Sequence, residues 1–115
     1  ALLSEIVLRT KDQDARIRTA AVEMLGLIGK SRTDILKVLE KTATGDELPL
    51  RFTSIKALNN IGQTDPGAVI PVLERAEKNN TDDRAKKIIA TFVKKLEKLQ
   101  PSKQSPDPKR EDKTN

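Results

Sequence analysis

Apolar side chains recur at helical spacing over the first hundred residues and are separated by short polar breaks. Leu3 and Val7, for example, are four residues apart, which places both side chains on one face of a helix. The breaks fall near residues 11–14, 29–34, 44–46, 62–65 and 79–81. The pattern therefore predicts an all-α fold of six helices, arranged as three helical hairpins.

Residues suited to helix ends flank these segments. Asp14 is placed to cap the second helix, because its carboxylate can accept hydrogen bonds from the free amides of the first turn. Gly29 is expected to end that helix in the left-handed conformation. Asp65 opens the fifth helix, and either Asn80 or Thr81 is expected to cap the sixth.

The apolar positions define the expected core. On the second and fourth helices they are Ile17, Ala21, Leu25, Ile28, Leu50, Ser54, Leu58 and Ile61, counting two small residues with the apolar ones. On the last two helices they are Val69, Ile70, Val72, Leu73, Ile88, Ile89, Phe92, Val93, Leu96 and Leu99. Ala21 and Ser54 are small where we expect two helices to approach closely.

The chain repeats itself every 33 residues. Matched pairs include Leu3/Leu36, Ile6/Leu39, Asp14/Glu47, Arg18/Arg51, Leu25/Leu58 and Gly29/Gly62. A weaker third copy supplies Val69, Val72, Asn80, Arg84 and Ile88, then loses the register at Thr91 and Lys95. Periods of this length indicate stacked helical units that bury their apolar faces against one another. We therefore expect one repeat domain over residues 1–99, with repeats at about 1–32, 33–65 and 66–99.

The second helices of the first two repeats resemble a known family, and the third copy matches it poorly. The segment DARIRTAA from Asp14 to Ala21, continuing to Gly29, is similar to the second helix of a HEAT-like repeat of the short, phycobilisome-lyase type. Residues 47–62 restate the pattern with Glu for Asp and Ser for Ala, and residues 69–73 look like the first helix of the same unit. The resemblance implies a right-handed α-solenoid of about three hairpins.

Three arginines recur at one place in the repeat, a turn into the second helix. They are Arg18, Arg51 and Arg84, beside the acidic or polar residues Asp14, Glu47 and Asn80. We expect a ladder of hydrogen bonds between successive repeats, because a guanidinium binds carboxylates and carbonyls in a fixed geometry. Binding of a ligand by these arginines is the alternative.

The composition changes abruptly at Gln100. Residues 100–115 contain three prolines among polar and charged residues and no apolar side chain. Such a segment cannot offset the entropy lost on ordering, so a disordered polar tail is expected.

The composition leaves few groups for catalysis. The chain has no Cys, His, Tyr or Trp, and so lacks the imidazole and thiolate that most acid–base and zinc sites use. HEAT-like DNA glycosylases share the architecture, but Trp and Tyr, the residues that ordinarily stack on bases in such recognition, are missing here. A bilin lyase is suggested by the repeat type, with no candidate catalytic group. We therefore expect a protein that is not an enzyme and holds no cofactor or metal.

Function is expected on the outward face of the second helices. The candidate partner-binding residues there are Arg16, Thr19, Glu23, Leu27, Phe52, Lys56 and Asn60. Phe52 is an aromatic residue of the kind that anchors protein interfaces; the alternative is that its ring folds over a neighbouring helix. The favoured function is a protein–protein interaction scaffold that binds its partner through this face.

A basic stripe on the last helix supports a second interpretation. Of the net charge of +5, most lies in residues 81–100, which hold six Lys/Arg against three Asp/Glu. Lys87, Lys94 and Lys98 fall within about 40° of one another on a helix. This helix and the tail could bind a nucleic-acid backbone or an acidic partner. The solvated outer face of a terminal repeat predicts the same pattern.

The remaining expectations concern the setting of the chain. No run of 18 apolar residues occurs, so no membrane span is expected. There is also no amino-terminal signal pattern, and a soluble, cytoplasmic protein is the expectation. The chain starts at Ala1 with a helical pattern already under way, which leaves open a trimmed chain that forms part of a longer repeat array.

Overall fold

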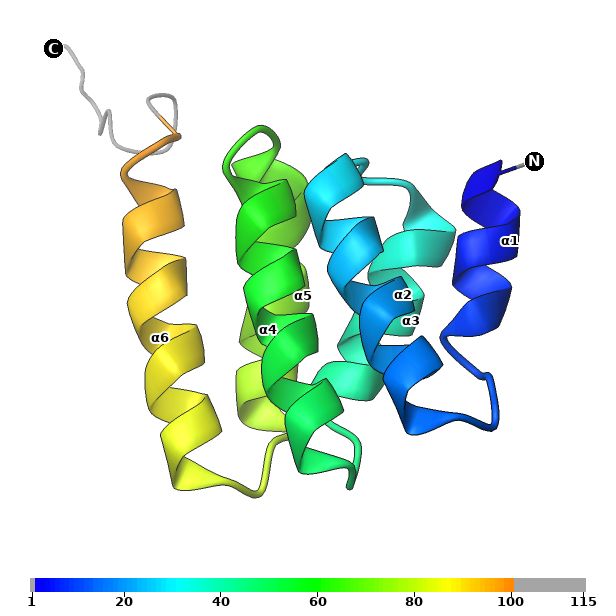
Figure 1. Cartoon of the computed structure of the whole chain (residues 1–115). Coiled ribbons are helices and arrows are strands. Elements are labelled where there is room, and N and C mark those ends of the chain that lie inside the picture. The colour runs from blue at the N-terminus through cyan, green and yellow to red at the C-terminus, as the bar shows by residue number, and fades with distance from the viewer. Residues whose placement is uncertain (1, 101–115) are drawn as a thin grey trace, which may run out of the picture.

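The structure, a computed structural model, describes residues 2–100, and this range contains six helices. They are α1 (Leu2–Arg9), α2 (Ala15–Ile28), α3 (Thr33–Ala43), α4 (Leu48–Gly62), α5 (Pro66–Lys78) and α6 (Asp83–Glu97). The helices pair as three consecutive hairpins, and no strand occurs between residues 2 and 100 (Figure 1). The predicted all-α solenoid of helical hairpins is confirmed.

The hairpins stack side by side into two layers (Figure 1). The second helices form one layer, in which α4 contacts both α2 and α6. The first helices form the other layer, in which α3 contacts α5. Because α4 also packs against α3 and α5, it lies at the centre of the stack.

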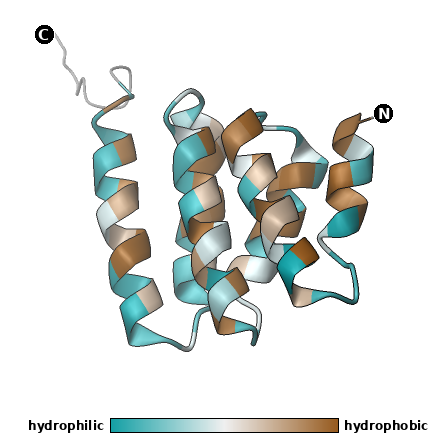
Figure 2. Ribbon diagram, viewed as in Figure 1, coloured by the Kyte–Doolittle hydropathy of each residue, from teal (hydrophilic) through white to brown (hydrophobic). Residues whose placement is uncertain are grey.

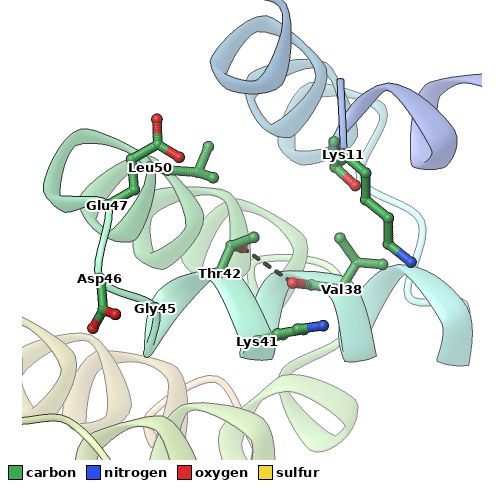
Figure 3. A pocket seen from close by; sticks show the side chains of 9 residues that line it. Lys11, Val38, Lys41, Thr42, Gly45, Asp46, Glu47 and Leu50 are labelled. Carbon is green, nitrogen blue, oxygen red and sulfur yellow. Dashed lines mark hydrogen bonds between the residues drawn. The ribbon is translucent and has the colours of Figure 1, made fainter. Parts of the chain in front are cut away.

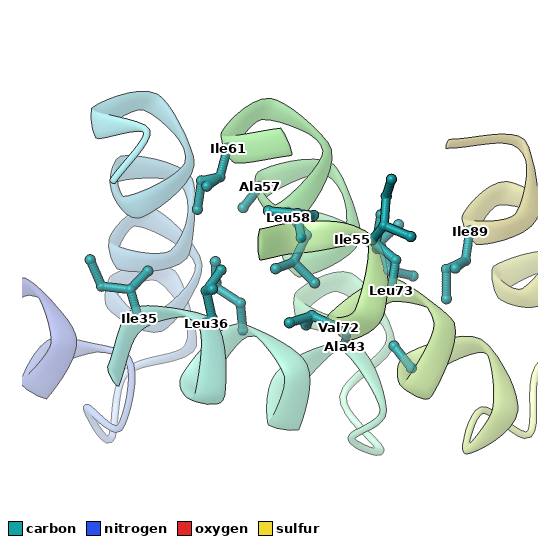
Figure 4. Packing of buried hydrophobic residues seen from close by; sticks show 14 of the residues in the cluster. Ile35, Leu36, Ala43, Ile55, Ala57, Leu58, Ile61, Val72, Leu73 and Ile89 are labelled. Atoms are coloured by element: carbon teal, nitrogen blue, oxygen red, sulfur yellow. The ribbon is translucent and has the colours of Figure 1, made fainter. Parts of the chain in front are cut away.

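One apolar core runs between the two layers. The largest fully buried side chains include Leu25, Ile35, Leu39, Ile55, Leu58, Ile61, Leu73, Ile89 and Leu96. They come from α2, α3, α4, α5 and α6, and Figure 4 shows many of them pointing into the space that these helices share. The hydropathy colouring in Figure 2 shows apolar and polar residues alternating around each helix, so that every helix contributes one apolar face.

Most of the predicted core positions are buried, but the prediction that Ile17 lies in the core is wrong. Its side chain is 41% exposed, whereas its repeat counterpart Leu50 is only 5% exposed. The difference arises because α4 has a hairpin on each side, while α2 has only the short helix α1 on its outer side. Helix α1 has eight residues, none of them buried, and leaves Ile17 and Met24 in an open groove. Leu99, at 46%, is also exposed.

The structure confirms three of the predicted helix ends. Asp14 accepts a hydrogen bond from the amide of Arg16 (2.9 Å), and Asp65 accepts one from the amide of Ala68 (3.3 Å). Gly29 ends α2 with φ of 75°, in the left-handed region where a side chain would be strained.

The predicted cap of α6 is wrong. Asp82 holds that position, and its carboxylate accepts hydrogen bonds from the amides of Arg84 (2.8 Å) and Ala85 (3.1 Å). Asn80 is instead buried and donates from Nδ2 to the carbonyl of Ala43 (2.8 Å).

The displaced cap explains why the third copy loses its register. Helix α5 has 13 residues where α3 has 11, so α6 begins 35 residues after α4 instead of 33. With this longer spacing Val93 takes the place of Leu58 and is buried. The repeat is therefore continuous in space even though the 33-residue period is broken.

The predicted disordered tail lies almost wholly outside the described residues, which end at Gln100.

Candidate protein-binding face

The outward face of the second helices contains a hollow between α2 and α4. It has a volume of about 370 Å³ and is lined by Glu23, Leu27, Thr53, Lys56, Ala57 and Asn60. Leu27 is 77% exposed, the largest exposed fraction of any large apolar side chain in residues 2–100. The α2–α4 hollow thus sets one exposed leucine among polar and charged groups.

A second hollow lies between α4 and α6. It has a volume of about 340 Å³ and is lined by Phe52, Lys56, Ile88, Thr91 and Phe92. The three apolar residues are only half-buried, and they pack against the edge of the core. The Arg84 guanidinium lies 5.4 Å from the centre of the Phe52 ring, within the range of a cation–π interaction. The α4–α6 hollow is therefore apolar inside, with basic groups at Arg84 and Lys56.

Lys56 joins the two hollows, because it lines both of them. Its side chain is exposed at the middle of α4. Together the hollows make one surface that crosses all three second helices. We call this surface the second-helix face.

The structure brings five of the seven predicted partner-binding residues onto this face. Glu23, Leu27 and Asn60 line the α2–α4 hollow, Phe52 lines the α4–α6 hollow, and Lys56 lines both. Arg16 and Thr19 line neither. The Arg16 side chain is 91% exposed at the start of α2 and forms an ion pair with Asp14 (3.1 Å).

The Phe52 ring folds over a neighbouring helix, which was the alternative to a freely projecting interface anchor. Its ring is half-buried at the edge of the core, beside α6, with Arg84 above it. The ring therefore forms part of the wall of the α4–α6 hollow and does not project freely.

Sequence reasoning missed the contribution of α6 to this face. Ile88 and Phe92 were expected in the core, yet both are half-buried and line the α4–α6 hollow. A signal was present, because the apolar residues of α6 cover a wider arc than one buried face needs. Ala85, Ile89, Val93 and Leu96 already form the buried stripe, so the i, i+4 pair Ile88 and Phe92 lies at its margin.

Comparison with known proteins identifies the repeat. The family model described as HEAT repeats matches residues 2–91. The chain belongs to the HEAT-repeat family. HEAT repeats generally serve as scaffolds for protein interactions. Neither the curated proteins nor the solved structures contain a match.

Arg18 forms the first step of an arginine ladder between these HEAT repeats. Its Nε and Nη2 donate to the two carboxylate oxygens of Glu47, at 3.1 and 2.7 Å, and its Nη1 donates to the carbonyls of Asp12 and Gln13. One side chain thus joins the loop of its own hairpin to the start of α4. The hydrogen bonds from Arg18 hold the pKa of Glu47 below its ordinary value.

Arg51 repeats this arrangement one HEAT repeat later. It is 5% exposed, and its Nε and Nη2 donate to the Gly45 carbonyl of its own hairpin, at 2.9 and 2.6 Å. Its Nη1 lies 3.7 Å from the Asp82 carboxylate of the next hairpin. Arg84 does not continue the ladder, because the two extra residues of α5 displace it and set it over Phe52. The arginines Arg18 and Arg51 therefore have the expected structural role.

The basic stripe lies on the outer side of the last HEAT repeat. Lys87, Lys94 and Lys98 are all exposed, on the side of α6 opposite its buried residues. No helix between residues 2 and 100 is long and apolar enough to cross a membrane. Within the same range no group of three or more acidic side chains is placed to hold a metal ion.

Proposed function

We propose that the chain is a non-catalytic scaffold that binds another protein through the second-helix face. The observation that carries the proposal is the meeting of two hollows at Lys56, one with the exposed Leu27 and one walled by Phe52 and Phe92. Apolar groups set within a polar rim are the usual composition of a protein-binding surface.

The two hollows suit different parts of a partner. The α4–α6 hollow offers an apolar wall of three side chains, which would accept an apolar side chain of the partner. The α2–α4 hollow offers Glu23, Lys56 and Asn60 around Leu27, which would exchange hydrogen bonds and ion pairs at its margin. An aromatic pocket beside a polar margin is the arrangement in which few residues contribute most of the binding energy.

Photo-crosslinking in the native source tests this proposal. A crosslinking amino acid is placed at Lys56, in the middle of the face, and in a second variant at Lys37, which is exposed on α3 in the other layer. We expect one protein to be captured at position 56 and not at position 37.

A substitution in the same face provides the control. Adding Leu27→Asp to the position 56 variant should abolish the capture, because Leu27 is exposed and its replacement leaves the core intact. Equal capture at positions 37 and 56 would refute the proposal. Capture at position 56 that is unchanged by Leu27→Asp would also refute it.

The alternative function is binding of a nucleic-acid backbone or an acidic partner by the basic stripe and tail. It is favoured by the exposure of Lys87, Lys94 and Lys98 on one side of α6. Affinity for a short DNA duplex should then fall by orders of magnitude between about 50 and 200 mM salt. A duplex that fails to bind at the lower salt concentration excludes binding of a nucleic-acid backbone and leaves the acidic partner as the form of this alternative.

The narrower resemblance to short repeats of the phycobilisome-lyase type stays a prediction from the residues of α2 and α4. A bilin-attaching activity would require a catalytic group, and the chain has neither cysteine nor histidine to supply one.

A further inference from the structure

A third cavity lies away from the second-helix face, at the junction between the first and second hairpins. It has a volume of about 410 Å³ and shares no residue with the two hollows of that face. Its lining residues are Thr10, Lys11, Val38, Lys41, Thr42, Gly45, Asp46, Glu47 and Leu50. A cavity of this size can hold a small ligand or one large side chain.

The corresponding junction between the second and third hairpins is closed by side chains. Asn80, two residues beyond α5, is 3% exposed and donates to the carbonyl of Ala43 (2.8 Å). Arg75 and Glu40 form an ion pair across the same junction, with Nη2 and Oε1 3.0 Å apart. These two contacts bridge α3 and the end of α5.

The first junction lacks both contacts because of the residues that stand there. Gly45, two residues beyond α3, takes the place of Asn80 and has no side chain to reach Thr10. The counterparts of Glu40 and Arg75, 33 residues earlier, are Val7 and Thr42, which cannot form an ion pair. The side chains that bridge the second junction therefore have no equivalent at the first junction, where the cavity lies.

The chemistry of the cavity divides into an apolar part and a cationic part. Val38 and the buried Leu50 supply the apolar surface. Lys11 and Lys41 extend along it toward Val38, and the Asp46 carboxylate points away from them (Figure 3). Neither lysine's ammonium group makes a hydrogen bond or an ion pair with any residue between 2 and 100. The acidic neighbour Glu47 is already engaged by Arg18.

We propose that this cavity binds a carboxylate attached to an apolar body, with Val38 and Leu50 contacting the body and Lys11 and Lys41 the carboxylate. Two unpaired ammonium groups beside an apolar surface attract the negative charge of such a ligand. The bound carboxylate also reduces the repulsion between the two ammonium groups. A free small carboxylic acid and a peptide that ends in an apolar residue share this chemistry. The site is independent of the second-helix face.

Titration of the full chain, followed through its amide NMR signals, tests the proposal with three probes. N-acetyl-leucine represents the free acid, acetyl-Gly-Gly-Leu the peptide terminus, and N-acetyl-leucinamide has the same body without the charge. We expect the acids to shift the signals of Val38 and Thr42, and the amide to bind about tenfold or more weakly, because it lacks the charged contact. Tighter binding of the tripeptide than of N-acetyl-leucine identifies a peptide terminus, and equal binding identifies the free acid.

Charge variants separate the site from general attraction to a basic protein. Lys11→Gln with Lys41→Gln should weaken binding of the acids by about tenfold or more. Lys41→Gln alone should also weaken it, whereas Lys37→Gln, which removes the same single charge from the same helix but outside the cavity, should leave it unchanged. All three lysines are exposed, so the variants keep the fold. Failure of both acids to bind, equal binding of acid and amide, or equal effects of the Lys37 and double variants would overturn the proposal.

Discussion

Gly26 of α2 faces Ala57 of α4 so closely that a methyl group at position 26 would come within 2.8 Å of both the Cα and the Cβ of Ala57. Both residues are buried where two second helices run side by side. This approach fixes the spacing of the first two hairpins, and so the width of the α2–α4 hollow, of which Ala57 is part.

Gly26→Ala should destabilise the protein. Alanine favours a helix over glycine by about 1 kcal/mol, but the new methyl group would meet backbone that cannot move alone, at a cost of about 1–3 kcal/mol. We expect a net loss in the free energy of unfolding, measured by chemical denaturation. Gly67→Ala is the matched control, since its nearest contact is the end of the Gln100 side chain at 3.1 Å. A Gly26 variant as stable as the control would contradict the close packing.

The pair of Arg18 and Glu47 predicts a dependence of stability on pH. Because Arg18 lowers the pKa of Glu47 in the folded state, the unfolded state takes up the proton first as the pH falls. The stabilisation by this pair is therefore complete at neutral pH and is lost progressively below about pH 4.3, the ordinary pKa of glutamate. Glu47→Gln should have a lower free energy of unfolding than the natural chain at pH 7, measured by chemical denaturation. This difference in the free energy of unfolding should become smaller toward pH 3.

The control for this pair is Glu23→Gln, which removes an exposed carboxylate of α2 that forms no ion pair within residues 2–100. The free energy of unfolding of Glu23→Gln should differ little from that of the natural chain at both pH values. A gap for Glu47→Gln that is the same at pH 7 and pH 3 would show that the ion pair contributes nothing to stability.

The central position of α4 predicts unequal costs of truncating two leucines. Leu58 is fully buried at the middle of the stack, so Leu58→Ala should cost about 2–5 kcal/mol. Leu99 is 46% exposed beyond the end of α6, and Leu99→Ala should cost about 0.5 kcal/mol or less. Equal shifts of the denaturation midpoint would contradict the layer arrangement.

The fold could be predicted from the sequence because the apolar spacing, the caps and the 33-residue period all agree. The failures have local causes. Ile17 was misplaced because its pattern matches that of Leu50, and only the stack reveals that α2 lacks a full hairpin on its outer side. The cap of α6 was misplaced because a fixed period of 33 residues does not allow for the two residues added to α5.

The second-helix face was harder to predict than the fold. Helical geometry alone identified Glu23, Leu27 and Lys56, since each lies on the outward side of its own helix. The part played by Ile88 and Phe92 depends on how α6 is set against α4, which single-helix patterns do not specify. The cavity at Lys11 and Lys41 depends on contacts between hairpins and had no signal in the local pattern.

The affinity for the protein captured through position 56 tests the function most directly. Isothermal titration calorimetry should show that Leu27→Asp weakens binding by about tenfold or more, equivalent to about 1.4 kcal/mol, while Lys37→Glu on the opposite layer has no effect. Unchanged affinity for the Leu27 variant, with the Lys37 variant impaired, would place the binding surface on the other layer and contradict the account.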